Sequence, residues 1–367
     1  MISTLYIERE IAEHPRAKAI IARFPDCRQV SIERYGDVFN QSAQNFRQQK
    51  QQPALILAKK HGRRVLPTPP DYHIGGQRNY YFSHMLNCVY DCRYCFLQGM
   101  YRSGNYVVFA NFDDFFDDIR STAEEDPSTP AWFFSGYDCD SLALNPVTEF
   151  TNEALDQFAT MPNAFMELRT KSTQIRPLLK REPVSNVVVA YSLSPDAIAQ
   201  AHEHKAPSLT KRLQALKELQ SAGWTVGLRF DPILYADNFK SLYTDLFNQT
   251  MDMLDVSAIH SVSLGPFRLP KPFYKRMIRL YPDSDLLAQP MRTKTAMVSY
   301  PQETENELLS FCEDELLKLI NKDQYFPCVS ISNPVNLATS DTQKPAHSAS
   351  NSNQSLHELA NRLEPQT

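Results

Sequence analysis

The stretch HMLNCVYDCRYCFLQ, residues 84–98, places three of the seven cysteines, Cys88, Cys92 and Cys95, within eight residues. The spacing is C-x3-C-x2-C. Three thiolates on one short loop can each hold one iron of a [4Fe–4S] cluster, which leaves the fourth iron without a protein thiolate. The other cysteines are scattered singly along the chain, and none is placed as a fourth ligand in this loop. The stretch therefore indicates an iron–sulfur cluster with one iron open for chemistry.

Two other interpretations of the cysteine loop stay open at the level of the sequence. Zinc would need a fourth ligand, and His84 is close enough in sequence to offer one. Disulfide bonds would leave one of the three cysteines over and would need an oxidising compartment. We favour the cluster, because three thiolates on one loop suffice for it.

The composition is that of an ordinary globular protein. Apolar residues make up 42% of the chain and charged residues 22%, and the net charge of −4 argues against non-specific nucleic-acid binding through a basic coat. No apolar run reaches the roughly eighteen residues of a membrane span, and the first residues lack the basic flank and apolar core of a signal peptide. We therefore expect no membrane association and a cytoplasmic location, where reducing conditions suit thiolate ligands.

Two groups of basic residues are candidates for contact with a nucleic-acid backbone, because Lys and Arg release its counterions. The alternative is that each group is simply a solvated face. The groups are Lys59, Lys60, Arg63 and Arg64, and Arg268, Lys271, Lys275, Arg276 and Arg279.

From about residue 78 the pattern becomes strands that alternate with helices. The clearest helix is 209–222, where Ser208 can cap the start, four leucines form one buried stripe and Gly223 ends the helix. Such alternation implies parallel β-α units with a site at the carboxyl ends of the strands. Six units predict an α/β fold with a partial (β/α)6 barrel. The expected strands are 79–85, 131–134, 165–170, 187–193, 225–230 and 261–264.

Three segments are expected along the chain. Residues 1–75, with a helix near 16–23 and a strand at 29–32, form an N-terminal extension packed on the core, and residues 76–332 form the partial barrel. Residues 333–367 are rich in Ser, Asn, Gln, Thr and Pro, and they cannot bury enough apolar surface to offset the entropy of ordering. We expect this tail to be disordered.

Beyond the cysteine loop, the chain resembles the spore photoproduct lyase family of radical S-adenosylmethionine (radical SAM) enzymes over roughly residues 5–332. The segment 92–98, CRYCFLQ, is similar to the family's C-x-Y-C-Y-L-Q, and 5–8, LYIE, to its N-terminus. Arg268 with Lys271-Pro272, followed by Tyr281-Pro282, is similar to the family's R-x-x-K-P and Y-P signature. Several matches in the correct order are more specific than one motif.

The resemblance implies repair of spore photoproduct, an ultraviolet-induced thymine dimer joined by a methyl bridge, in DNA. An electron from a low-potential donor such as flavodoxin or ferredoxin would allow the [4Fe–4S] cluster to cleave S-adenosyl-L-methionine. The resulting 5′-deoxyadenosyl radical would take a hydrogen from C6 of the lesion, whose bases must first leave the stack. The alternatives are a divergent radical SAM enzyme acting on RNA, a peptide or a nucleoside, and a non-catalytic zinc-stabilised nucleic-acid-binding module.

The resemblance also assigns roles to individual residues. Besides the three cluster cysteines, it implies S-adenosylmethionine contacts for Tyr94, Cys139, Asp140, Lys171 and Ser192. It places the DNA end of the site in the C-terminal part of the barrel segment, with Arg268, Lys271 and Tyr281 as candidates.

The departures from the family pattern concern catalysis. Tyr137 occupies the position of the family's hydrogen-donating cysteine, and Cys139 lies two residues on, where an extended segment would point it the same way. The alternative is that Cys139 is a small buried residue, as free cysteines commonly are. Phe96 and Leu280 replace a tyrosine and an arginine of the family. The catalytic candidates are therefore Cys139, Tyr137 and Tyr94.

The variant Cys92→Ala removes one of the three expected cluster ligands. It should lose most bound iron and all cleavage of S-adenosylmethionine, because two thiolates cannot hold the cluster. Iron and sulfide analysis after anaerobic reconstitution, with chromatography of 5′-deoxyadenosine, measures both effects. Retention of both properties would contradict the cluster assignment.

Overall fold

The computed structural model describes residues 2–69, 72–294 and 296–328 of the chain. The expected disordered tail, residues 333–367, lies outside the described residues. Within the described part, no helix combines the length and the apolar character that a membrane crossing needs.

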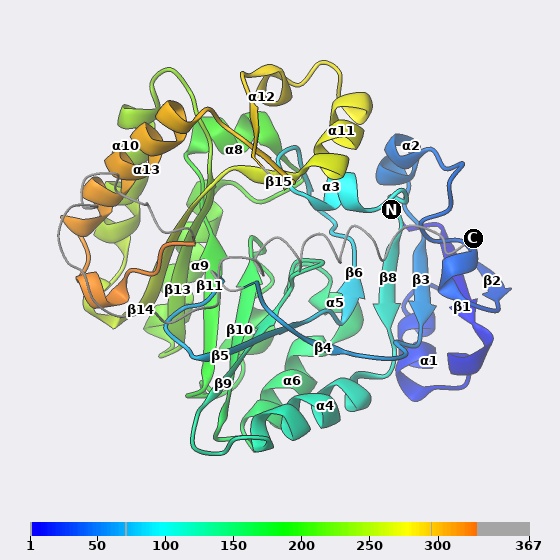
Figure 1. Ribbon diagram of the computed structural model, residues 1–367. Helices are drawn as coiled ribbons and strands as arrows, with labels where there is room; N and C mark the ends of the chain where they lie inside the picture. Colours follow the sequence, from blue (N-terminus) through cyan, green and yellow to red (C-terminus); the bar gives the residue numbers. More distant parts are fainter. Residues whose placement is uncertain (1, 70–71, 295, 329–367) are drawn as a thin grey trace, which may run out of the picture.

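Seven strands form the larger of two main sheets, in the order β14-β13-β11-β10-β9-β5-β4. The six strands from β14 to β5 pair in parallel, while β4 is antiparallel to β5. This arrangement confirms the predicted partial (β/α)6 barrel (Figure 1). The strands are β4 (Val65–Pro67), β5 (Arg78–Phe82), β9 (Ala131–Ser135), β10 (Ala164–Thr170), β11 (Val187–Ser192), β13 (Thr225–Ile233) and β14 (Ile259–Pro266).

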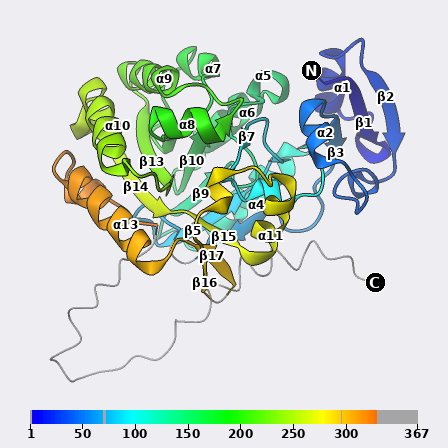
Figure 2. The same ribbon diagram turned by 90° about the horizontal axis from the view of Figure 1, so that it is seen from above.

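Helices connect the strands of the larger sheet and cover its outer side (Figure 2). In α9 the backbone N–H of Lys211 donates to the Ser208 hydroxyl at 3.5 Å, and the four leucines of the predicted stripe are at most 2% exposed. Both the cap and the buried stripe are therefore confirmed. The helices are α4 (Phe112–Glu124), α5 (Asn145–Thr148), α6 (Phe150–Phe158), α7 (Arg176–Leu179), α8 (Asp196–His202), α9 (Leu209–Ser221) and α10 (Phe239–Met253), with a 3-10 turn at Val256–Ala258.

The second sheet has five strands, in the order β2-β1-β3-β8-β6. The strands of this sheet come from both sides of the expected segment boundary at residue 75, because β1, β2 and β3 precede that residue while β6 and β8 follow it. Strand β4 also precedes residue 75, but it belongs to the larger sheet. The predicted strand 79–85 was too long: β5 ends at Phe82, and Met85 begins β6 in this second sheet. The elements are β1 (Thr4–Glu8), β2 (Arg28–Ile32), β3 (Leu55–Ala58), β6 (Met85–Leu86), β8 (Tyr106–Phe109), α1 (Pro15–Ala22), α2 (Phe46–Gln51), and 3-10 turns at Arg9–Ile11 and Tyr35–Asp37.

The elements from β15 to β17, with α11 and α12, pack above the carboxyl ends of the parallel strands, where α11 lies against α3 (Leu97–Met100), the helix that follows the cysteine loop (Figure 1). Helix α13 instead packs beside α10 and β14. A three-stranded antiparallel sheet, β15-β17-β16, accompanies α11. The elements are β15 (Arg268–Pro270), α11 (Lys271–Leu280), α12 (Asp285–Ala288), β16 (Arg292–Lys294), β17 (Met297–Ser299), α13 (Gln302–Leu317) and a 3-10 turn at Lys322–Gln324.

Gly99 allows the close approach of α3 and α11. A Cβ at this position would lie 2.5 Å from the carbonyl oxygen of Phe273, which is backbone and cannot turn aside. We expect Gly99→Ala to destabilise the protein by about 1–3 kcal/mol, because overpacking forces the backbone to shift. Thermal unfolding measures the effect. Gly36→Ala is the matched control, since a Cβ there meets nothing within 4 Å; equal melting temperatures for both variants would contradict the prediction.

Candidate active site

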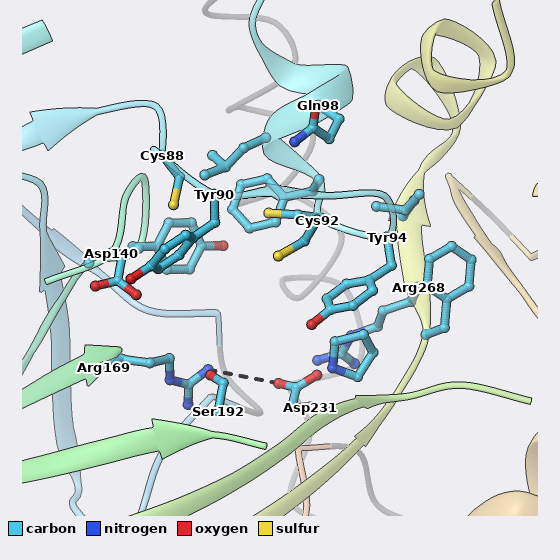
Figure 3. A pocket seen from close by; sticks show the side chains of 18 of the residues that line it. Cys88, Tyr90, Cys92, Tyr94, Gln98, Asp140, Arg169, Ser192, Asp231 and Arg268 are labelled. Carbon is cyan, nitrogen blue, oxygen red and sulfur yellow. Dashed lines mark ion pairs between the residues drawn. The ribbon is translucent and has the colours of Figure 1, made fainter. Parts of the chain in front are cut away.

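A cavity of about 330 Å³ lies at the carboxyl ends of the six parallel strands. Each strand, or the loop that follows it, contributes lining residues, and the cysteine loop closes one side (Figure 3). Among the residues predicted from the sequence, the lining includes Cys88, Cys92, Cys95, Tyr94, Tyr137, Cys139, Asp140, Lys171, Ser192 and Arg268. The structure therefore brings together residues that are up to 180 positions apart in the chain.

The cysteine loop presents three thiols to this cavity. Cys88, Cys92 and Cys95 are all free, and burial raises the pKa of each thiol. Soft sulfur ligands on one loop, enclosed by protein, fit an iron–sulfur cluster. Within the described residues, no group of three His, Cys, Asp or Glu side chains could hold a single metal ion. His84 instead stacks flat on Phe150, with ring centroids 3.8 Å apart.

A buried carboxylate, Glu203, anchors the cysteine loop. Glu203 belongs to β12 (Glu203–His204), which pairs with β7 (Asp91–Cys92) inside the loop. Its carboxylate accepts hydrogen bonds from the Tyr94 hydroxyl and the Arg212 guanidinium, and from the Ser194 hydroxyl at 3.0 Å. The ammonium of Lys171 lies 3.9 Å away. Arg212 and Lys171 therefore share one carboxylate.

Asp140 connects the turn after β9 to the end of β10. One of its carboxylate oxygens accepts from the backbone N–H groups of Leu142 and Ala143 at 3.0 and 2.9 Å, and from the Thr170 hydroxyl at 2.6 Å. The other accepts from the Lys171 backbone N–H at 2.7 Å. Burial raises the pKa of Asp140, and these hydrogen bonds oppose that effect. Asp140 therefore fixes the point at which the Lys171 side chain leaves its strand.

The segment that carries Tyr137 and Cys139 is a turn. The expectation of an extended segment was wrong, because Gly136 has φ +82° and the Cys139 N–H donates to the Gly136 carbonyl at 3.4 Å. Both side chains still line the cavity. Tyr137 stacks on Tyr81 with ring centroids 4.3 Å apart, and Phe96 lies 5.6 Å away, so aromatic rings form this wall.

Sequence reasoning missed an ionic group on the floor of the cavity. Arg169 and Asp231 both line the cavity, with nitrogen and oxygen 3.9 Å apart (Figure 3). Glu167 accepts from Arg169 at 3.0 Å and from the fully buried Arg229 at 2.6 Å. Strand β10 carries Glu167 and Arg169, and strand β13 carries Arg229 and Asp231. Only the alternation of side chains along a strand could have placed the two members of each pair on the same side.

The three candidate DNA residues lie in three different environments. Arg268 lines the cavity and donates to the Cys328 carbonyl at 3.3 Å. Lys271 is exposed at the start of α11, outside the cavity lining. Tyr281 is buried, and its hydroxyl donates to Gln98 Oε1 at 2.7 Å, so it supports the helix after the cysteine loop. The structure thus brings only the first of the three to the cavity.

The two basic groups also differ in their contacts. Lys59 pairs with Glu10 at 2.8 Å and Arg64 with Asp118 at 3.0 Å, so part of the first group is engaged in ion pairs. In the second group, Arg276 donates to the carbonyls of Gly99 and Met100 at 2.6 and 3.0 Å. Its remaining exposed members are Lys271, Lys275 and Arg279, which lie four residues apart on one face of α11.

Comparisons with known proteins agree with this site. The sequence model of the spore photoproduct lyase family matches residues 76–317. Spore photoproduct lyases from Geobacillus sp. (strain Y412MC61) and Bacillus subtilis (strain 168) are 23% and 22% identical over 203 and 202 residues. Each alignment covers 54% of this chain and 59% of the relative. The chain spans less than two thirds of the length of these relatives.

Solved structures show the same fold. A spore photoproduct lyase variant with bound AdoMet and dinucleoside spore photoproduct matches with a TM-score of 0.77 and 17% identity, over 90% of this chain and 98% of that one. Another, complexed with dinucleoside spore photoproduct, has a TM-score of 0.75 at the same identity and coverage. The fold and site define a radical SAM type of barrel. With two thirds of the sequence matched by the family model, the chain belongs to the spore photoproduct lyase family.

The variant Glu203→Gln tests the role of the Glu203 carboxylate in holding the cysteine loop. Burial disfavours the charged form of Glu203, but Lys171 and Arg212 outweigh it and hold the pKa below its ordinary value. Loss of the charge leaves Arg212, 0% exposed, without its counter-ion, which costs about 3–5 kcal/mol. Because the pKa of Glu203 is lower in the folded state, its ionised carboxylate stabilises the protein at pH values above the ordinary pKa of 4.5. This stabilisation is lost as the pH falls through the lowered pKa.

Thermal unfolding as a function of pH measures this effect. The melting temperatures of wild type and Glu203→Gln should differ most near neutral pH and converge in acid, below the ordinary pKa. Glu218→Gln is the control, because Glu218 is exposed on α9 and should change stability by about 0.5 kcal/mol at most. A constant gap across the pH range would contradict the prediction.

Proposed function

We propose that this protein is a radical SAM lyase that repairs spore photoproduct in ultraviolet-damaged DNA. The observation that carries the proposal is the shared cavity: three thiols of a C-x3-C-x2-C loop face the carboxyl ends of six parallel strands. When bound there, a [4Fe–4S] cluster and S-adenosylmethionine supply a carbon-centred radical that abstracts hydrogen. Family membership and the related structures with bound AdoMet and dinucleoside spore photoproduct support the assignment.

Different residues of the cavity can bind a carboxylate, bind a lesion phosphate and exclude water. Lys171, held in place through Asp140 and Glu203, offers a cation to a carboxylate, and Ser192 offers a hydroxyl at the end of the next strand. Arg268 offers a second cation on the far side of the cavity, suited to a lesion phosphate. The aromatic wall around Tyr137 keeps water away from a radical.

Two side chains can return a hydrogen atom to the product radical. Burial raises the pKa of the Cys139 thiol and of the Tyr137 hydroxyl well above their ordinary values, so both groups keep their hydrogen at neutral pH. Both line the cavity. In this proposal Cys139 is the donor, and it replaces the cysteine that the family has at the position of Tyr137.

The proposal includes a cellular setting. A low-potential electron donor such as flavodoxin or ferredoxin supplies the electron, and the protein acts in the cytoplasm, where its seven free cysteines stay reduced. The second candidate function is a radical SAM reaction on a different substrate, such as RNA, a peptide or a nucleoside. Tyr137 and Phe96, which depart from the family pattern at the cavity wall, favour that candidate.

Anaerobic reconstitution tests the proposed function directly. The reconstituted chain is reduced and incubated with S-adenosylmethionine, with and without irradiated DNA, and the products are separated by chromatography. We expect 5′-deoxyadenosine together with reversion of methyl-bridged dimers to thymines. Formation of 5′-deoxyadenosine with persistent dimers would overturn the lyase function in favour of another substrate.

The variant Cys139→Ala tests the hydrogen donor. It should still cleave S-adenosylmethionine in the presence of lesion DNA but divert the product to trapped adducts, since the thiol hydrogen is gone. Mass spectrometry of the digested DNA measures the product spectrum. Tyr137→Phe should leave that spectrum unchanged, and so should Cys312→Ala, which removes a buried thiol in α13. Adducts with Tyr137→Phe and none with Cys139→Ala would assign the role to Tyr137.

A further inference from the structure

Lys50, in the last turn of α2, is a lysine almost completely enclosed by protein. Its exposed fraction is 3%, and its ammonium donates to the Cys88 carbonyl at 2.9 Å and to Asn87 Oδ1 at 3.3 Å. The rings of Phe46 and Tyr106 flank the ammonium, with centroids 5.7 and 5.9 Å away. The N-terminal segment therefore places a cation next to Cys88, the first cysteine of the loop.

The hydrogen-bond partners of this ammonium are neutral carbonyl oxygens, which do not balance a buried charge. Burial lowers the pKa of Lys50, while Cys88, Asp91 and Cys95 act in the opposite direction. Asp91 is itself paired with Arg93 at 3.2 Å. The Lys50 ammonium therefore lies beside the first of the three cysteines, with carbonyl oxygens and no carboxylate as its hydrogen-bond partners.

The structure fixes Lys50 in this position from several sides. The Gly104 N–H donates to Gln49 Oε1 at 2.8 Å and ties α2 to the loop before β8. The Lys205 ammonium donates to the Lys50 carbonyl at 2.5 Å. Asn87, in the left-handed region with φ 70°, is 0% exposed, and its side-chain amide donates to the carbonyl oxygens of residues 103 and 105. The ammonium therefore cannot turn away into solvent.

We propose that Lys50 is a positioning residue that raises the reduction potential of a cluster held by Cys88, Cys92 and Cys95, an inference that rests on the proposed function. Uptake of one electron from a low-potential protein donor adds one negative charge at the loop. A fixed cation in a poorly screened environment stabilises that added charge, whereas an exposed lysine would be screened by water. Hydrogen bonds and charges around the ligands change the reduction potential of iron–sulfur clusters.

Redox titration of the reconstituted full chain, followed by electron paramagnetic resonance, tests the inference. At a fixed potential, Lys50→Met should show about a tenfold smaller ratio of reduced to oxidised cluster, which corresponds to about 59 mV for one electron. Lys50→Gln, which keeps a donor without the charge, should shift in the same direction. Lys50→Arg keeps the charge and should remain near wild type. Lys217→Met, an exposed lysine on α9, is the control and should not shift.

The outcomes separate this inference from the proposed function. A wild-type chain that binds no cluster overturns both. A cluster whose potential is the same in wild type, Lys50→Met and Lys50→Gln overturns the role of Lys50 alone. A shift in Lys50→Met that is absent from Lys50→Gln assigns the effect to the hydrogen bond and also overturns the role of charge. If Lys50→Met does not fold, the Gln and Arg variants decide.

Discussion

The burial of charged side chains next to the cysteine loop determines how the site is built. Glu203 anchors the loop and binds Arg212, while Lys50 reaches the loop from the N-terminal segment. An unpaired charge in such an environment costs several kcal/mol, so these elements cannot move independently of the loop. The three thiols face the cavity because distant parts of the chain hold the loop in that position.

The sequence predicted the features that are local or periodic. Cysteine spacing depends on the chemistry of one loop, and a strand such as Val187–Ser192, buried at every position, leaves an apolar run that can be recognised. The carboxyl ends of parallel strands then converge by topology, and Lys171 and Ser192, which the family resemblance had assigned to the site, line the cavity there.

Contacts between single polar side chains that are far apart in the chain could not be predicted in this way. Tyr94 and Glu203 are 109 residues apart, and Tyr281 contacts Gln98 across 183 residues. Neither pair leaves a periodic signal, because each contact depends on how two elements pack. The extended path expected for Tyr137 to Cys139 failed for a local reason: Gly136 adopts a conformation that turns the chain.

The smaller sheet has a consequence for how separable the parts of this protein are. Strand β8 pairs with β3 on one side and with β6 on the other, and all four of its residues are buried. A chain that began after residue 75 would lack β1, β2 and β3 and would present β8 as a bare apolar edge, the kind of edge that recruits strands from other molecules. The segment before the barrel is therefore a protective cover for the strand that follows the cysteine loop, and the barrel is not a module that can be cut free of it.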